Sequence, residues 1–358
     1  MSDRVRRLML HLPLLAVLPA RADRRFDPVV PGAERQLPRD HGAHPGHRIE
    51  WWYVTGWLDR PVGAQAGFQI TFFRVRQPEH EANPSAFAPR QVLFAHAAVS
   101  EVSSGRLRHA QKIARAGFGL AEASVSDLDV RIDDWHLARR PGPERLLARI
   151  EAADFGLALE FLPTQPVLWQ GEGGFSRKGP QAEYASHYLS WPQLAVKGTL
   201  RSGSVKSAVR GRAWLDHEWS SALMPEGAQG WDWLGINLDD GGALMAFRMR
   251  DAAGKPLWAA ATLRDASGDR RHGPEEVFFA VRRVWRSPRS AGAYPVEMDV
   301  SVGQRRFRLQ PLLDDQELDS RASSGAIYWE GAVTASEGGR TVGRGYLELT
   351  GYAAALKI

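Results

Sequence analysis

The 358-residue chain contains no cysteine. This absence excludes disulfide scaffolds, zinc ribbons, iron–sulfur centres, thiol catalysis and a bacterial lipid-anchored cysteine. The chain also lacks long stretches in which apolar residues recur at the 3.6-residue helical period, so we expect helices to be few and short. No apolar run approaches the roughly 20 residues that a membrane-spanning helix needs, and we therefore expect no stable membrane insertion.

Positive charge is only in small excess, at +5, and much of it lies near the N-terminus. Residues 1–7 carry three arginines, residues 8–20 are mostly apolar, and Ala20-Arg21-Ala22 is a small-x-small site. This order is typical of a secretory signal sequence (1–22), so we expect cleavage after Ala22 and a periplasmic or secreted protein. Removing four arginines and one aspartate leaves a net charge of +2. A nearly neutral chain without a basic tract is not expected to bind nucleic acid.

Short aromatic and β-branched segments, separated by glycine, proline, aspartate and serine, dominate the rest of the chain. Thirteen tryptophans and 35 glycines fit a β-rich protein with many turns and a large apolar interior. The segments 50–58, 67–76 and 92–102 set the pattern, which continues to residue 350. The sequence therefore predicts an all-β protein of antiparallel strands.

The length of the chain predicts about two domains, and an internal similarity supports this. Trp51-Trp52-Tyr53 aligns with Trp231-Asp232-Trp233 at an offset of 180, and each is followed by a glycine turn and a second apolar strand. A period this long indicates domain duplication. We expect an extended arm over 23–38 and two antiparallel β-barrels over 39–202 and 203–358, because closure removes exposed strand edges.

The first motif is the segment DHGAHPGHRIEWWY, residues 40–53. Its histidines and Glu50 are metal-ligand types, but glycine and proline make the helix that would align them unlikely to form, and we assign no metal. One interpretation is a loop that plugs a barrel mouth through hydrogen bonds to backbone groups. The other places His41, His44, Glu50 and the adjacent Trp52 at a ligand pocket.

The second motif is DHEWSS, residues 216–221. A carboxylate beside an indole is partly desolvated, which raises its pKa and lets it serve as a general acid. We therefore take Asp216, His217 and Glu218 as candidate catalytic residues, with Trp219 as a ligand contact. The alternative is a strand end whose carboxylates cap a turn and pair with Arg212. Ser220-Ser221 lacks the context of a nucleophile elbow, so we predict no serine hydrolase triad.

The third motif, Gly230-Trp231-Asp232-Trp233, places a carboxylate between two indoles on a strand. Because side chains alternate along a strand, Trp231 and Trp233 point one way and Asp232 the other. Asp232 is the fourth candidate catalytic residue, and both tryptophans are candidate ligand contacts. His96 and His187 lie in apolar strands and are either satisfied core residues or further ligand contacts.

These motifs together resemble the AttH-like family, which includes carotenoid 1,2-hydratase (hydroxyneurosporene synthase) and many exported proteins labelled "predicted secreted hydrolase". The resemblance rests on DHGAHPGHRIEWWYVTGWL, HYLSWPQLAVKGTL, GRAWLDHEWSS and GWDWLGINLDDG, and it extends from about Arg39 to Tyr352. It implies two lipocalin-like (calycin-type) barrels in tandem. An H-x-W pattern of the hydratases matches His217 and Trp219, and Asp232 is the nearest match to their acidic partner.

The resemblance implies a hydrophobic ligand such as a polyene, an isoprenoid or a lipid-like molecule, and no cofactor. Two function classes follow. One is a hydratase or related acid-catalysed enzyme, since hydration of an isolated double bond needs a poorly solvated acid and aromatic faces near the carbocation. The other is a non-catalytic binding protein that accompanies an ABC-type export system. In both cases we expect the three motifs to converge on one cavity at the domain junction, with His41 or His44 beside Asp216 or Glu218, and Asp232 beside Trp219.

Overall fold

The computed structural model describes residues 25–61, 65–142 and 144–356. The expected signal sequence therefore lies outside the described residues. Residues 25–38, which belong to the expected arm, contain no strand. No helix in the described part of the chain is long and apolar enough to span a membrane.

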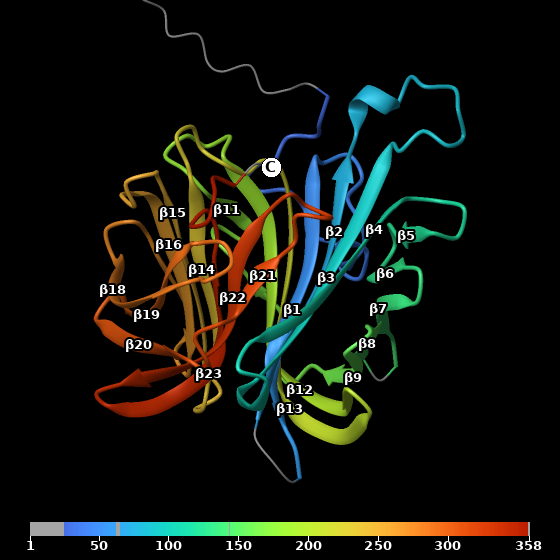
Figure 1. Ribbon diagram of the computed structural model, residues 1–358. Coiled ribbons are helices and arrows are strands. Elements are labelled where there is room, and N and C mark those ends of the chain that lie inside the picture. Colours follow the sequence, from blue (N-terminus) through green and yellow to red (C-terminus); the bar gives the residue numbers. More distant parts are fainter. Residues whose placement is uncertain (1–24, 62–64, 143, 357–358) are drawn as a thin grey trace, which may run out of the picture.

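The prediction of an all-β fold is confirmed (Figure 1). The helices of the described residues are three single 3-10 turns: η1 (Arg39–His41), η2 (Pro78–His80) and η3 (Val102–Ser104). The strands of the first half are β1 (Ile49–Asp59), β2 (Ala66–Arg76), β3 (Gln91–Glu101), β4 (Leu107–Arg115), β5 (Ala121–Ala123), β6 (Asp129–Ile132), β7 (Trp135–Arg140), β8 (Arg145–Glu151), β9 (Phe155–Leu162), β10 (Leu168–Trp169), β11 (Phe175–Arg177), β12 (Ala185–Ser202) and β13 (Val205–Ala222).

The strands of the second half are also joined by short connections. They are β14 (Gly230–Leu238), β15 (Ala243–Arg250), β16 (Pro256–Asp265), β17 (Gly268–His272), β18 (Val277–Arg286), β19 (Ala293–Val302), β20 (Arg305–Pro311), β21 (Glu317–Asp319), β22 (Ile327–Glu337) and β23 (Arg340–Leu349).

The strands form two antiparallel sheets with matching strand order. The first runs β4-β3-β2-β1-β13-β12-β9-β8-β7-β6-β5, and the second runs β17-β16-β15-β14-β23-β22-β20-β19-β18. In each sheet the first strand of the half lies between its hairpin partner and the last strand of the half. The sequence repeat between β1 and β14 therefore corresponds to equivalent places in the two sheets, as duplication requires.

The position at which the chain changes sheet differs from the expected boundary at residue 203. Gly203 lies in the tight turn of the β12–β13 hairpin, where Ser202 pairs with Val205, and its φ of 57° suits a glycine. Both strands of this hairpin belong to the first sheet, so the passage to the second sheet occurs between Ala222 and Gly230. The small polar segment predicted as a link is a hairpin turn.

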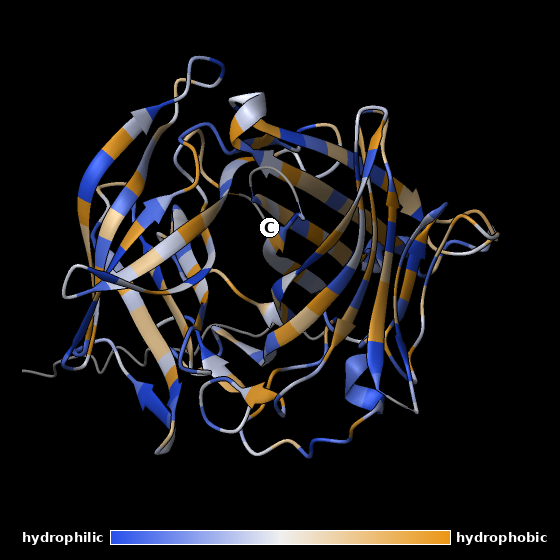
Figure 2. Cartoon of the chain, turned by 90° about the horizontal axis from the view of Figure 1, so that it is seen from below, coloured by the Kyte–Doolittle hydropathy of each residue, from blue (hydrophilic) through white to orange (hydrophobic). Residues whose placement is uncertain are grey.

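Each sheet bends around its own apolar core (Figure 2). In the first sheet β4 comes close to β6, and in the second β16 comes close to β18, so both sheets approach closure. The alternation of side chains along each strand sends one set into this core. On β1, for example, Trp52, Val54 and Leu58 are buried inside the first sheet.

The opposite set of side chains packs the two sheets against each other. Tyr53 and Trp57 of β1, Trp214 of β13, Trp233 of β14 and Tyr346 of β23 belong to one buried cluster between the sheets. The outer faces of β1 and β13 thus lie against β14 and β23. Successive residues of these strands therefore point alternately into a barrel and into the junction.

Candidate functional site

A cavity of about 460 Å³ lies between the two sheets. This volume is within the range of small-molecule sites, which are mostly apolar with a few placed polar groups. Its lining comes from β1, β2, β3, β4 and β13 of the first sheet and from β14, β15, β22 and β23 of the second. The large apolar side chains of the lining are Trp51, Phe73, Phe94, Leu223, Trp231, Trp233, Phe247, Met249 and Tyr328.

Four acidic side chains and one lysine interrupt this apolar lining. Asp216 and Glu218 lie on β13, Glu330 lies on β22, Glu348 lies on β23, and Lys178 follows β11. Asp216 and Glu218 share a face because they are two residues apart on one strand. Ionisable groups gathered in an apolar cavity are candidates for a functional site, because burial shifts their protonation equilibria.

Asp216 is almost fully buried and is held by three donors. Oδ1 accepts hydrogen bonds from Ser190 Oγ at 2.5 Å and Trp214 Nε1 at 2.6 Å, and Oδ2 accepts one from Tyr188 Oη at 2.6 Å. Burial raises the pKa of Asp216 to about 7, although these three hydrogen bonds lower it in part. Near neutral pH this carboxyl group therefore exists in both protonation states.

Glu330 is the least satisfied acid of the cavity. The Tyr53 hydroxyl donates a short hydrogen bond to Oε1, while Oε2 is buried and accepts no hydrogen bond from any described residue. Burial raises the pKa of Glu330 well above its usual range, and the nearby carboxyl group of Glu348 raises it further. Burial therefore favours the protonated form of Glu330, a residue of the cavity lining, more strongly than for an exposed glutamate.

Glu348 behaves similarly, although part of its surface remains accessible in the cavity. Burial raises its pKa to about 8, a hydrogen bond from Trp231 opposes this, and the carboxyl groups of Asp216 and Glu218 add to the increase. Because neighbouring carboxylates repel one another, ionisation of one acid in the cavity raises the pKa of the next, as in pairs of catalytic carboxyl groups.

Glu218 differs from the other three because it has a cationic partner. Lys178 Nζ lies 2.7 Å from its Oε1, and the Ser186 hydroxyl donates to the same oxygen. The ammonium group also lies over the rings of Tyr188 and Phe247, at 4.7 and 4.3 Å from their centroids. A buried cation on aromatic faces, beside a carboxylate, makes this end of the cavity the polar one.

Among the residues predicted from sequence, Asp216, Glu218, His96, Trp231 and Trp233 line the cavity. His96 is buried there, with Nδ1 2.8 Å from the Tyr328 hydroxyl and Nε2 2.8 Å from Ser323 Oγ. Burial lowers its pKa to about 3, so its ring is neutral. His96 therefore contacts both sheets and contributes an uncharged hydrogen-bonding group to the cavity lining.

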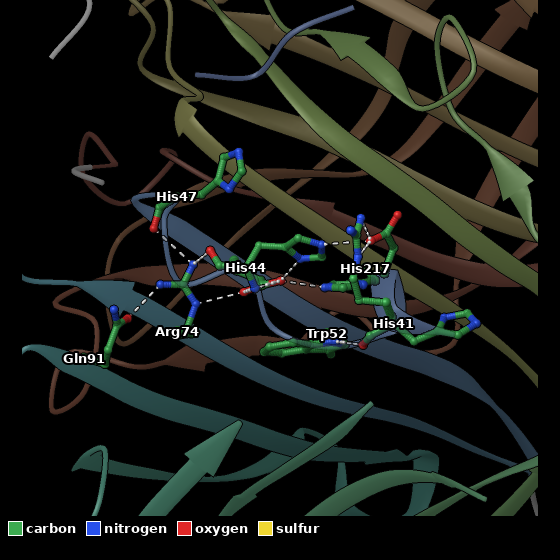
Figure 3. Close-up of polar contacts among 10 residues, drawn as sticks. His41, His44, His47, Trp52, Arg74, Gln91 and His217 are labelled. Atoms are coloured by element: carbon green, nitrogen blue, oxygen red, sulfur yellow. Dashed lines mark hydrogen bonds and ion pairs between the residues drawn. The ribbon is translucent and has the colours of Figure 1, made fainter. Parts of the chain in front are cut away.

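Most of the other predicted residues lie inside the first sheet, on the opposite face of β1 and β13 or packed against that face (Figure 3). Their centre is Glu50, whose Oε2 accepts a hydrogen bond from Arg74 Nε at 2.8 Å. His44 Nδ1 and His217 Nε2 lie 2.8 and 2.9 Å from Oε1, and the His44 backbone N–H donates to Oε2 at 2.8 Å. The charge of Arg74 and the two histidine contacts hold the pKa of Glu50 well below its usual range, although burial alone would raise it.

Aromatic stacking surrounds this Glu50 cluster. His44 stacks on Trp219 with centroids 3.7 Å apart, and Trp52 stacks on His217 at 4.9 Å. Trp52 Nε1 donates to the carbonyl of His41, and His187 lies 5.4 Å from the ring of Trp219. These contacts fasten residues 39–47 to β1 and β13, which is the arrangement expected of a loop that plugs a barrel.

One group in the described residues has the composition of a metal site, namely His44, Glu50 and His217, whose ligand atoms lie within 4.8 Å of one another. Both imidazoles are already at hydrogen-bond distance from the same carboxylate oxygen. The guanidinium of Arg74 occupies the other oxygen and would repel a cation. The donors present therefore satisfy this carboxylate without a metal.

Asp232 is also separate from the cavity. It points into the second sheet, where Arg248 Nε lies 2.6 Å from Oδ2, and Arg250 Nε and the Tyr352 hydroxyl lie 3.2 and 2.9 Å from Oδ1. The expectation that the three motifs converge on one cavity is thus wrong. His44 pairs with Glu50 and not with Asp216 or Glu218, and Asp232 does not contact Trp219.

Glu330, Glu348, Lys178 and Tyr53 were not predicted from the sequence. A signal for the two glutamates was present, since each is a single acid within an apolar stretch of its strand: Tyr-Trp-Glu-Gly-Ala over 328–332 and Tyr-Leu-Glu-Leu over 346–349. Such an acid must face water, a partner or a cavity. Lys178 follows a two-residue and a three-residue strand and has no comparable signal.

The AttH-like family model matches residues 28–352 of this chain. Among solved structures, a candidate AttH from Nitrosomonas europaea is 51% identical, with a TM-score of 0.86, covering 91% of this chain and 100% of that one. No curated protein sequence matches the chain.

Two more distant structures share the fold. Kievitone hydratase from Nectria haematococca is 14% identical, with a TM-score of 0.66, covering 92% of this chain and 98% of that one. CghA in complex with Sch210972 is 12% identical, with a TM-score of 0.52, covering 94% and 97%. The prediction of a lipocalin-like all-β architecture is confirmed by these similarities.

Proposed function

Because this chain belongs to the AttH-like family, we propose that its cavity binds a hydrophobic molecule and catalyses a cofactor-free, acid-initiated reaction such as hydration of a carbon–carbon double bond. The family resemblance read from the motifs is thereby confirmed, whereas the reaction is the proposal. The observation that carries it is Glu330, a buried acid of the aromatic cavity lining that has one unpartnered oxygen and a pKa raised by burial.

The reaction can be written with the groups present. Glu330 transfers its proton to one carbon of the double bond, and the π electrons form the new C–H bond, which leaves a carbocation on the other carbon. The faces of Trp51, Phe73 and Trp233 stabilise that positive charge. Water then attacks the cation through its oxygen and releases a proton to a cavity carboxylate. Return of that proton to Glu330 restores the enzyme, so that one water molecule is added overall.

Asp216 is suited to accept that last proton. Its pKa of about 7 lets it take up and release a proton near neutral pH, and general acid–base groups work best in this range. Lys178 forms an ion pair with Glu218. The charges of this pair favour an ordered water at that end of the cavity. The fold of kievitone hydratase is the same as that of this chain, which is compatible with hydration but does not assign it.

The same cavity also suits the non-catalytic alternative, a protein that binds a lipophilic molecule for an ABC-type export system. The unsatisfied acid favours catalysis over simple binding, since an apolar ligand gains nothing from a buried carboxyl group. Export remains part of the proposal. Mass spectrometry of protein from the native host should find a mature N-terminus at Asp23, and an intact Met1 would contradict it.

The test begins with extraction and identification of lipophilic molecules that co-purify with the protein. Wild type and Glu330→Gln are then incubated with the identified molecule in heavy-oxygen water, with the exposed Glu226→Gln as the matched control. We expect label in a new hydroxyl group with wild type and E226Q, and a rate loss of about 10²–10⁴-fold with E330Q while binding is retained. Binding without conversion by wild type would establish the alternative function, and full activity of E330Q would refute the assigned acid.

A further inference from the structure

Two exposed phenylalanines stand close together at one end of the first sheet. Phe87, in the β2–β3 connection, is 67% exposed, and Phe118, just after β4, is 60% exposed. Their rings stack with centroids 5.0 Å apart, and the Arg115 guanidinium lies 5.1 Å from one and 4.2 Å from the other. In Figure 1 the β2–β3 connection projects beyond the ends of the strands that it joins.

The backbone around Phe118 is built to display this side chain. Gly117, Phe118 and Gly119 all have positive φ, at 94°, 57° and 75°. The left-handed region is unfavourable for a bulky residue such as phenylalanine, and such outliers cluster at functional positions. A polar residue with a local hydrogen bond would fit this exposed turn with less strain. The turn therefore favours presentation of an aromatic ring to the surroundings.

An apolar row connects this end of the sheet to the cavity. Across four neighbouring strands, Trp51 pairs with Phe73, Phe73 with Phe94, and Phe94 with Ile113. All four side chains line the cavity, and Ile113 on the edge strand β4 is 52% exposed. Arg115 lies two residues further on the same face of β4 and contacts both phenylalanines.

We propose that the aromatic tip, defined as Phe87, Ile113, Arg115, Phe118 and the 48% exposed Leu120, docks reversibly on a lipid bilayer and admits the apolar substrate along the row to the cavity. This inference rests on the proposed function, since it identifies the source of the substrate as a membrane. Exposed aromatic and aliphatic side chains insert at the level of the lipid headgroups, where an arginine can reach the phosphates.

A lipid surface fits the tip better than a protein partner does. The tip consists of two projecting loops and a strand end, and a stable protein interface needs more than about 1,000 Å² of complementary surface. Acidic residues such as Glu79, Glu81 and Glu122 lie in the same segments, so the attraction should come from the apolar side chains and not from net charge.

The test measures co-sedimentation of the full chain with phosphatidylcholine vesicles at low salt and at 0.5 M salt, without substrate. Phe87→Ser/Phe118→Ser is compared with Phe278→Ser, which removes another exposed phenylalanine, on β18. We expect wild type and F278S to bind at both salt concentrations, and the double variant to lose about tenfold in partitioning for each phenylalanine. Melting temperatures at or above that of wild type verify the fold, since all three side chains are exposed and serine relieves strain at position 118.

Equal binding by F87S/F118S and wild type would overturn the proposal, and so would equal loss with F278S. Binding that requires phosphatidylserine and disappears at 0.5 M salt would assign the attraction to basic residues and also overturn it. Failure of the proposed function is distinguishable, because the vesicle assay needs no turnover. With substrate dispersed in detergent, F87S/F118S should retain wild-type ligand binding, since neither phenylalanine lines the cavity.

Discussion

Asp216→Asn should make the protein more stable above neutral pH and reduce the dependence of its stability on pH. The folded state raises the pKa of Asp216 from 3.8 to about 7. Between these values the unfolded chain loses a proton that the folded chain keeps, so the stability contribution of this group is complete below pH 3.8 and is lost as pH rises through 7. Asparagine resembles the protonated acid and cannot ionise.

The magnitude follows from proton linkage. One proton bound only by the folded state changes the free energy of unfolding by about 1.4 kcal/mol per pH unit. Between pH 5 and pH 7 the wild type should therefore lose roughly 2 kcal/mol more than D216N, because the folded group begins to ionise as pH 7 is approached. The substitution itself should cost little, because Asn Oδ1 can still accept from Ser190 and Trp214, and the amide N–H can donate to the Tyr188 hydroxyl.

The assay is urea unfolding of wild type, D216N and the exposed-site control Asp154→Asn at half-unit steps from pH 4.5 to pH 8.5. D154N should follow the slope of the wild type, while the D216N curve should be shallower and cross above it near neutral pH. Parallel curves for wild type and D216N would show that Asp216 is ionised in the folded protein throughout. The assignment of this residue as a proton acceptor near pH 7 would then be refuted.

Two further predictions concern the ionisable clusters outside the cavity. Asp232→Asn should lower the free energy of unfolding by about 3–5 kcal/mol, because it removes the anion between Arg248 and Arg250. Ligand affinity, measured by calorimetry, should stay within twofold of wild type. A large loss of affinity would contradict the placement of Asp232 outside the cavity. His44→Phe keeps the ring over Trp219 but removes contacts with Asp40 and Glu50 that raise the pKa of His44 above 6.5 despite burial. The stabilisation from protonated His44 is present below pH 6.5 and is lost as pH rises. The cost of H44F in unfolding free energy, about 1.5–3 kcal/mol at pH 5.5, should therefore shrink by pH 8.5. An equal cost at both pH values would show that His44 stays neutral.

The strands could be predicted from the sequence more reliably than the boundaries between them. The alternation in 50–58 and 67–76 corresponds to β1 and β2. Pro192, in contrast, is a residue type that usually ends a strand, whereas β12 continues through it. The pairing with β13 shifts register between Trp191 and Leu194, and Gln193 has a φ of 56°. A bulge of this kind absorbs a proline that the sequence presents as a break.

The candidate site was predicted only in part because one motif serves two places. Asp216 and Glu218 face the junction between the sheets, while His217 and Trp219 face the interior of the first sheet. Residues adjacent in sequence on a strand point to opposite faces, so the density of chemistry in DHEWS did not indicate a single site. Glu330 and Glu348 approach it only through the packing of two separate sheets, which no local pattern contains.

The state of pairing separates the structural acids of this protein from those suited to chemistry. Glu50 and Asp232 are each neutralised by arginine and several hydrogen bonds, so their burial is compensated within the fold. Glu330 has a single donor, and Asp216 has three donors but no cation. Burial of an acid without a cationic partner costs free energy that an apolar side chain would not. Elsewhere in the described residues Glu50 and Asp232 show that a buried acid can be compensated by arginine. Buried acids without such a partner depart from this pattern, and departures of this kind concentrate at functional sites.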